Sequence, residues 1–480
     1  MATIDKTSVR AEIDKIKAEF DTLQKAGKIS AEATAIMNSM FLILNLILSI
    51  FLEKKTTKNN RNSSLPSSQS NKDDSVPPES GRKNKRKLET NSTANNMRSK
   101  ESVTLIQVYS CDTCGEDLQQ VPPESHERRT QIDIIFEKVV DHMDAEIKKC
   151  PSCDRFTKGS FPVDRYGPLQ YGNGLKAFVI NLATCHMVAL SRVQKLVNSM
   201  IGKAIAEASI LKFIRNLYLV LDDWEQSATR QLLQSSAMNV DETSLRVDKK
   251  NYWIHVYSAG EITLKCLHRK RGKEAIEAIN IIPRYKGVII HDCWASYLTY
   301  EHCRHGLCGS HLLRELQFVV ESNNYCWARH MARLLKRACR IVSAQEKKKL
   351  DKKSFQRLQR IYRNILNRGE KELPKILPKP VGKRGKLAKS DAHNLWERLK
   401  EYESAVLLFA SETYVPFTNN RAERDLRMAK VKQKVSGCFR TLDYAQAYCR
   451  ISSYVQTMSN KGHNPLIAIQ MALAGNIYPD

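Results

Sequence analysis

The alternation of apolar and polar residues between positions 238 and 291 constrains the fold of this chain more than any other feature. Segments 238–247, 252–257 and 262–267 follow one another after short polar breaks, which predicts three adjacent strands in a meander. Residues 273–282 then have a helical pattern that stops at Pro283. The wholly apolar run 288–290 predicts a fourth strand, buried on both faces in a mixed or parallel sheet.

Two aspartates lie where this sheet would bring them together. Asp241 is in the first strand and Asp292 closes the fourth. Because a right-handed crossover puts the fourth strand beside the first, we expect both carboxylates at one site. A third acid, Glu423, falls in the opening turns of a helix that Asn419 or Asn420 can cap. Three strands, a helix, a strand and then helices is the layout of an RNase H-like nuclease core, an α/β fold with a mixed sheet.

Three passages of the chain resemble a known family. They are Val-Asp-Glu-Thr at 240–243, Asn-Asn-Arg-Ala-Glu-Arg at 419–424 and Ser-Gly-Cys-Phe-Arg-Thr at 436–441. All three are similar to the DDE transposases of the bacterial insertion sequence 66 family. The resemblance covers most of the chain, including the stretch 60–68 and two Cys-x-x-Cys pairs.

The resemblance includes one element with two departures. Cys308-Gly-Ser-His311 followed by Arg314 looks like the family's Cys-Trp-Ala-His-x-x-Arg, with Gly309 and Ser310 in place of Trp and Ala. A further departure is Cys293-Trp294 after Asp292, where a Gly is common. These departures affect details of the substrate channel more than the reaction class.

The resemblance implies that the three acids hold two Mg²⁺ (or Mn²⁺) ions, with Asp241 bridging both and Asp292 and Glu423 each completing one. Two such ions activate the attacking water or 3′ hydroxyl and stabilise the leaving oxygen, and magnesium takes hard oxygen ligands. Each acid alone reads as a solvated surface charge. Glu242 is expected on the other side of its strand, and Asp425 on another face of its helix.

Four cysteines, Cys111, Cys114, Cys150 and Cys153, form two Cys-x-x-Cys pairs. Such pairs suit a structural zinc ion, although the segment between them exceeds the roughly 15–20 residues that are common. A redox dithiol is the alternative. Strand-like residues at 132–140 predict a hairpin in that segment, as in a zinc ribbon.

An excess of positive charge indicates a polyanionic partner. The chain has 77 Lys and Arg against 51 Asp and Glu, a net charge of +26, which favours a nucleic acid over an anionic lipid surface. The family resemblance implies that this nucleic acid is double-stranded DNA. The expected DNA is the terminal repeats of the element and its target. Side chains expected at DNA are Cys308, His311, Arg314, Arg421, Arg424 and Arg427. For the three later arginines a structural ion pair is the alternative, and for Cys308 and His311 a second metal.

The remaining segments suggest a modular chain. Val9, Ile13, Ile16, Phe20 and Leu23 lie on one helical seam, and Ile36, Met40, Ile43, Ile47 and Ile50 repeat the spacing. Self-association through this arm, giving a homo-oligomer, and plain helical packing are both open. The expected order is a helical or coiled-coil arm (1–53), a basic linker (54–103), a zinc-binding domain (104–160), a helix-turn-helix-like domain (161–232), the first part of the core (233–313), a basic helical insertion (314–412) and the last part of the core (413–480).

The chain has no feature of secretion or membrane insertion. Residues 1–26 are polar and charged, and the apolar stretch 35–52 is interrupted by Asn38, Ser39, Asn45 and Ser49. With 13 scattered cysteines, a reduced cytoplasm and association with the nucleoid are expected. Accessory proteins of the same element are a further expectation. Two rival functions stay open: a zinc-ribbon DNA-binding regulator whose core is inactive, and a structure-selective nuclease that cuts without joining.

Overall fold

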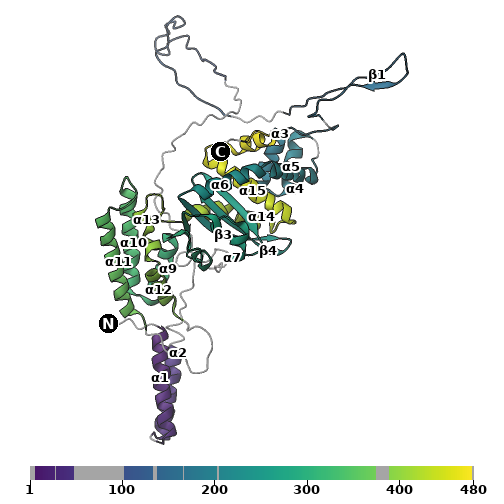
Figure 1. Ribbon diagram of the computed structural model, residues 1–480. Coiled ribbons are helices and arrows are strands. Elements are labelled where there is room, and N and C mark those ends of the chain that lie inside the picture. Colours follow the sequence, from purple (N-terminus) through teal and green to yellow (C-terminus); the bar gives the residue numbers. More distant parts are fainter. Residues whose placement is uncertain are drawn as a thin grey trace.

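A five-stranded mixed sheet lies at the centre of the computed structural model, which describes residues 6–27, 29–47, 102–132, 138–165, 167–202, 205–374 and 389–477 (Figure 1). The strand order is β5-β4-β3-β6-β7. The strands are β3 (Ala237–Val247), β4 (Lys250–Ala259), β5 (Ile262–His268), β6 (Val288–His291) and β7 (Arg304–Leu307). The first three pair antiparallel, and β6 and β7 run parallel to β3. This mixed α/β arrangement is compatible with an RNase H-like core.

The predicted meander and crossover are confirmed. All four residues of β6 are buried, as the unbroken apolar run indicated, and Ala237 of β3 pairs with Val288. The helix α7 (Lys273–Ile279) ends earlier than predicted, because Asn280 adopts a left-handed conformation (φ 57°) that closes it. Pro283 lies beyond this end, in the short 3₁₀ helix η3 (Ile282–Arg284). The fifth strand, β7, was not predicted.

One face of the sheet shares a core with six helices. These are α3 (Asn173–Thr184), α4 (Leu190–Ile201), α5 (Glu207–Val220), α6 (Asp222–Gln234), α15 (Leu442–Asn460) and α16 (Pro465–Leu473). The helices expected as a helix-turn-helix are α4 and α5, and Gly202 caps α4 with φ 68°. The apolar side of α5 is buried in the same cluster as Met238 and Val240 of β3. These helices therefore form part of the packing on the sheet.

The opposite face of β6 contacts a second helical group. The helices α9 (Gly309–Asn323), α10 (Cys326–Ala344), α11 (Lys352–Glu372), α12 (Asp391–Glu401) and α13 (Glu403–Ser411) run between β7 and α14 (Asn420–Ser436), and the short α8 (Ala295–Leu298) follows β6. Their core includes Val288 and Ile290, whereas Ile289 between them faces the first cluster. Helix α14 packs on β3 and β4 through Ala422, Leu426 and Ala429. The sheet is thus covered on both faces.

Two smaller units precede the sheet. Helices α1 (Lys6–Lys25) and α2 (Ala31–Ile47) lie side by side, with the rings of Phe20 and Phe41 5.8 Å apart (Figure 1). Other residues of the predicted seams, including Ile16, Ile36 and Ile43, are exposed, so self-association of this arm stays a prediction. No helix among the described residues is both long enough and apolar enough to cross a membrane. The linker at 54–101 lies outside the described residues.

The cysteine-containing segment differs from the predicted hairpin. The strands β1 (Ile147–Lys149) and β2 (Phe156–Lys158) pair antiparallel around Cys150 and Cys153. In the described parts of 132–140, where a hairpin was expected, there is no strand, and residues 133–137 lie outside the description. The apolar side chains Ile132, Val139 and Val140, at the described ends of that stretch, are exposed. The hairpin therefore surrounds the second cysteine pair.

Candidate active site

Strand alternation places Asp241 on the face of the sheet that α14 covers. Asn239, two residues earlier and therefore on the same side, donates a hydrogen bond to Asn419 just before α14 (Nδ2 to Oδ1, 2.8 Å). Glu242 points to the other side, as predicted, where the hydroxyl of Tyr297 donates to its Oε2 at 2.6 Å. Asp292 follows the neighbouring parallel strand β6. The two aspartates therefore lie on adjacent strands.

The electrostatics of Asp241 indicate that the acids are close together. Burial raises the pKa of the Asp241 carboxyl well above its ordinary value, and the charges of Glu242, Asp292 and Glu423 raise it further. A hydrogen bond from the backbone N–H of Glu242 to Oδ1 (2.8 Å) opposes this only in part. Negative charge gathered around a partly desolvated carboxylate is an environment that a divalent cation neutralises.

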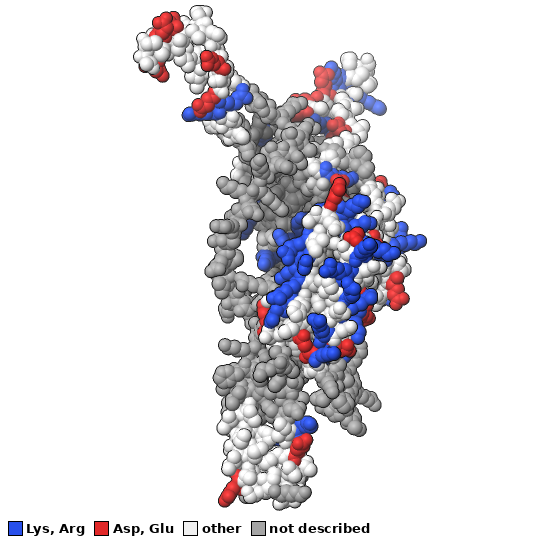
Figure 2. All heavy atoms as spheres, turned by 90° about the vertical axis from the view of Figure 1, so that its left-hand side faces the viewer, with Lys and Arg blue, Asp and Glu red and all other residues white. Residues whose placement is uncertain are grey.

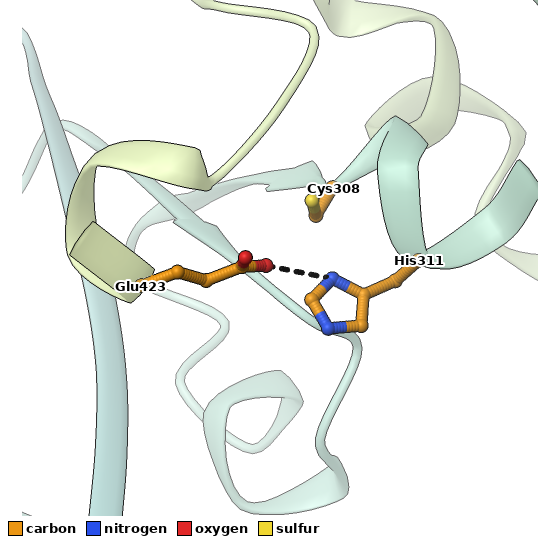
Figure 3. A group of neighbouring side chains, drawn as sticks. All are labelled: Cys308, His311 and Glu423. Atoms are coloured by element: carbon orange, nitrogen blue, oxygen red, sulfur yellow. Dashed lines mark ion pairs between the residues drawn. The ribbon is translucent and has the colours of Figure 1, made fainter. Parts of the chain in front are cut away.

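Glu423 lies in the first turn of α14 and faces α9 (Figure 3). Its Oε1 is 3.5 Å from Nδ1 of His311 and 3.7 Å from Nη2 of Arg314. The sulfur of Cys308 completes a group whose ligand atoms all lie within 4.8 Å of one another. Glu423 Oε1 and His311 Nδ1 are buried and have no hydrogen-bond partner. Buried polar atoms without partners are rare in proteins and fit a site that binds an ion.

The backbone around Asp292 is set by two histidines. The amide of Cys293 donates to His291 Nδ1 at 3.1 Å, so Nε2 carries the proton and donates to Nδ1 of His305, also at 3.1 Å. Burial lowers the pKa of His291 to about 3, which keeps the ring neutral. Asp292 Oδ1 accepts from the amide of Trp294 at 3.1 Å. Cys293 itself has φ 71°, a conformation that favours glycine.

Comparison with known proteins identifies the family. A family model described as "Transposase IS66 family" matches residues 168–447, which is more than half of the chain and includes all three acids. The chain belongs to the IS66 family of transposases. A comparison with curated proteins found no match. Transposases are nucleic-acid-processing enzymes whose partner is DNA, and divalent metal use is general among those with the DDE acids.

Asn419 connects the two acid-bearing elements of this transposase family member. Its Nδ2 donates to the carbonyl of Val240 at 2.8 Å, while its Oδ1 accepts from Asn239. Its backbone N–H donates to the sulfur of Cys308 at 3.1 Å. Asn419 is 1% exposed. The residue expected as a helix cap therefore joins β3 and β7 to the start of α14 rather than capping the helix with its side chain.

The two neighbouring acids have structural partners. Arg271 donates to Glu242 through Nε (2.8 Å) and Nη2 (2.6 Å). On α14, Asp425 is buried and accepts hydrogen bonds from Ser258 and Thr263 at 2.7 and 2.9 Å. Both acids were expected to point away from the site, and these contacts account for their burial.

The three arginines of α14 differ in their surroundings. Arg421 donates to the carbonyls of Gly260 and Ile262 and lies 3.9 Å from Asp425, so it has the structural role that was the alternative. Arg424 and Arg427 are exposed. Among the ion pairs of the described residues, Glu423 pairs with His311 and Arg314 and not with Arg427. Cys308 is 1% exposed, which leaves its sulfur beneath the surface.

The two cysteine pairs form separate turns outside the matched region. Cys111 accepts a backbone hydrogen bond from Gly115 (2.9 Å), and Cys150 accepts one from Asp154 (2.9 Å). Hydrogen bonds from the backbone of Cys114 and Thr113 lower the pKa of the Cys111 thiol to about 7, which favours the thiolate that zinc binds. In the described part of the chain, no three of the four sulfurs lie within 4.8 Å of one another.

Several functional contacts were not apparent in the sequence. The link from Asn419 to β3 and the pair His311–Glu423 each join residues more than a hundred positions apart, which no local pattern reveals. The positive φ of Cys293 did have a signal, because the family commonly has Gly there. Arg271 stacks on the rings of Trp253 and Trp294, 5.0 and 4.4 Å from their centroids. In the sequence it is one of three consecutive basic residues at 269–271, and nothing there distinguishes it from its neighbours.

Proposed function

We propose that this protein is a DDE transposase that binds the ends of its element, cleaves phosphodiester bonds there and transfers the 3′ ends to target DNA. The observation that carries the proposal is the raised pKa of the Asp241 carboxyl, which desolvation and then the charges of Glu242, Asp292 and Glu423 cause. The placement of Asp241 in β3, of Asp292 after the adjacent strand β6 and of Glu423 in the first turn of α14, which packs on β3, supports one shared site. Two magnesium or manganese ions at this site would activate the nucleophile and stabilise the leaving oxygen.

The chain's own residues have distinct parts in this proposal. Asp241 is the central ligand, because the charges of both Asp292 and Glu423 are among those that raise the pKa of its carboxyl. Asp292 is oriented by the Trp294 amide, which occupies Oδ1 and leaves Oδ2 for an ion. Glu423 is placed by the first turn of α14, whose start Asn419 ties to β3. Hard carboxylate oxygens are the ligands that magnesium takes.

A basic surface on the helical insertion supports DNA binding. Figure 2 shows Lys and Arg side chains gathered on the face that carries α10 and α11. Exposed members of this surface, here called the basic face, are Arg333, Lys336, Arg337, Arg340, Lys352, Lys353, Arg357 and Arg360. Within the described residues none of them forms an ion pair with an acid. Unpaired surface cations bind phosphates with release of counterions, so we assign the basic face to the DNA backbone.

The four cysteines are proposed to hold a structural zinc ion that draws the two turns together. The lowered thiol pKa values of Cys111 and Cys150 support this, since zinc binds thiolates. The test is zinc analysis of purified variants. Cys150→Ser should lose the zinc, whereas the control Cys326→Ser, which changes an exposed cysteine of α10, should retain it. Equal zinc in both variants would contradict the assignment.

The central test is cleavage of DNA that carries the inverted repeats flanking the coding region. Asp241→Asn, Asp292→Asn and Glu423→Gln should each lower Mg²⁺-dependent cleavage by more than about a hundredfold, the upper end of what loss of a ligand's partner costs. Band-shift affinity for the same DNA should be unchanged. The matched control is Asp443→Asn, an exposed acid at the start of α15, which should cleave normally.

The same assay separates the alternatives. Joined products, in which element 3′ ends are linked to target DNA, distinguish a transposase from a nuclease that only cuts. DNA binding without any metal-dependent cleavage would favour the inactive regulator. Normal cleavage by Glu423→Gln would remove that residue from the proposed set of three acids.

A further inference from the structure

Cys308, His311 and Glu423 form a group of potential metal ligands that the three-acid mechanism does not use as a whole. Their ligand atoms lie within 4.8 Å of one another, and His311 Nδ1 is 3.5 Å from Glu423 Oε1 (Figure 3). A thiolate, an imidazole and a carboxylate are the ligands of zinc and similar borderline cations. Magnesium takes oxygen and not sulfur. The group therefore differs in metal preference from the three acids.

The group is held by the backbone of two helix starts. Cys308 immediately precedes α9, and His311 lies three residues later, so one helical turn brings their side chains to the same side. The amide of Asn419 donates to Cys308 Sγ at 3.1 Å, and the amide of Gly309 donates to the carbonyl of Phe417 at 2.8 Å. These bonds fix the start of α14, and with it Glu423, against the start of α9.

The group lacks the hydrogen bonds that would satisfy it without a ligand. Nδ1 of His311 and Oε1 of Glu423 are both buried and unpartnered. Arg314 is 3.7 Å from Oε1, beyond hydrogen-bonding distance. Nδ1 of His311 therefore faces Oε1 of Glu423 at 3.5 Å, with the sulfur of Cys308 beside both atoms.

We propose that Cys308, His311 and Glu423 bind a zinc-class divalent cation, and that this binding withdraws Glu423 from the magnesium-dependent reaction. Zinc bonds of about 2.0–2.3 Å in a tetrahedron put ligands roughly 3.3–3.8 Å apart. The three side chains would have to close by about 1 Å, a rotamer adjustment in the first turns of α9 and α14. The Cys308 thiol loses its proton to solvent as the sulfur–metal bond forms. The inhibitory half of the proposal rests on the proposed function, because it needs Glu423 as a magnesium ligand.

Binding is tested with cobalt(II), whose thiolate complexes absorb by charge transfer. Full-length wild-type protein, Cys308→Ser and Cys303→Ser are titrated in parallel under reducing conditions. Cys303 is a buried cysteine of the same region, and its sulfur donates a hydrogen bond to the carbonyl of Tyr300. Any signal from Cys111, Cys114, Cys150 and Cys153 is common to all three proteins and cancels. We expect one cobalt equivalent and its charge-transfer absorption to be lost from Cys308→Ser alone; equal titrations in Cys308→Ser and wild type would overturn the proposal.

A second variant guards against misfolding of Cys308→Ser. His311→Gln retains the thiol, and the same cobalt site should weaken by at least about tenfold, as ligand loss requires. Unchanged affinity would again contradict the site.

The inhibitory half of the proposal is tested separately. Mg²⁺-dependent cleavage is measured with added Zn²⁺ and compared with each protein's own rate without zinc. Cleavage by Cys303→Ser should be inhibited at the same Zn²⁺ concentration as cleavage by the wild type. Inhibition of Cys308→Ser should need about ten times more Zn²⁺. Cobalt binding without zinc inhibition would leave the site standing and refute its action on Glu423, whereas absence of cleavage in every protein would concern the proposed function alone.

Discussion

Asn419 donates a hydrogen bond through Nδ2 to the carbonyl of Val240 at 2.8 Å, and this bond connects the strand of Asp241 to the helix of Glu423. The same side chain accepts from Asn239, and both asparagines are buried. Asn419 therefore acts as a positioning residue that sets where the third acid stands relative to the first.

Removing this link should misplace Glu423. Asn419→Ala leaves the carbonyl of Val240 and the amide of Asn239 without partners, which costs about 1–3 kcal/mol of stability per buried group. We expect a lower unfolding midpoint, and a fall in kcat that exceeds any change in KM for DNA. Asn364→Ala, at an exposed position of α11, is the control. A variant that is destabilised yet retains wild-type kcat would show that the link is only structural.

Asp241 should destabilise the metal-free protein. Its carboxyl is buried among like charges, which raise its pKa, and Asp241→Asn removes one of those charges at nearly constant shape. We expect a higher melting temperature in EDTA, corresponding to about 1 kcal/mol or more. We also expect that adding Mn²⁺ no longer raises it, because ligand binding stabilises only the form that binds. A lower melting temperature in EDTA would contradict this account.

Cys293 should tolerate glycine and reject a β-branched residue. Its φ of 71° lies in the left-handed region, which costs an L residue about 1–2 kcal/mol and glycine much less. Because the wild-type cysteine already bears this cost, Cys293→Gly should unfold within about 1 kcal/mol of wild type, whereas Cys293→Val should be less stable than both, since a β-branched residue is an outlier in this region. Urea denaturation measures both. Equal stability of the two variants would mean that the turn adjusts freely.

His291 should make the protein less stable in mild acid. Burial, and then the neighbouring His305, lower its folded pKa to about 3, against about 6.5 in the unfolded chain. Between these values the unfolded state binds the extra proton, so the free energy of unfolding falls as the pH drops. From pH 7.5 to 5.5 this residue should account for a loss of about 1.4 kcal/mol. Urea midpoints at the two pH values should differ less in His291→Gln, and an unchanged difference would assign the effect to other groups.

Gly309 should be required by the ring of Phe417. A Cβ at position 309 would overlap that ring, so Gly309→Ala should destabilise by about 1–3 kcal/mol. Phe417→Ala should relieve part of this cost in the double variant. If the losses in the free energy of unfolding of the two single variants simply added in the double variant, Gly309 and Phe417 would not compete for the same space. The contact also accounts for Gly309 in place of the family's Trp, because Phe417 occupies the space that a side chain at position 309 would need; nothing in the structure explains Ser310 in place of Ala.

The sheet and the position of two acids were predictable because their determinants are local. Period-two segments and one unbroken apolar strand gave the order of β3 to β6, and the crossover rule placed Asp292 beside Asp241. The strand β7 was missed because its four residues, Arg304–Leu307, include two polar side chains and a glycine. The hairpin expected at 132–140 stays a prediction, because residues 133–137 lie outside the described part of the chain, while Ile132, Val139 and Val140 at its ends are exposed. The contact of His311 with Glu423 depends on how α9 and α14 pack, which a single sequence does not encode in any spacing.

The five helices from α9 to α13 leave the sheet and return to nearly the same place. The amide of Gly309 meets the carbonyl of Phe417 at 2.8 Å, and Cys308 meets Asn419, so both ends of the excursion are fastened to each other. The excursion is not independent of what it leaves, because His311 and Arg314 at its start contact Glu423 and its helices share a core with Val288 and Ile290 of β6. Exposed positions on α10 and α11, which take no part in these contacts, can therefore vary while the two fastened ends stay together.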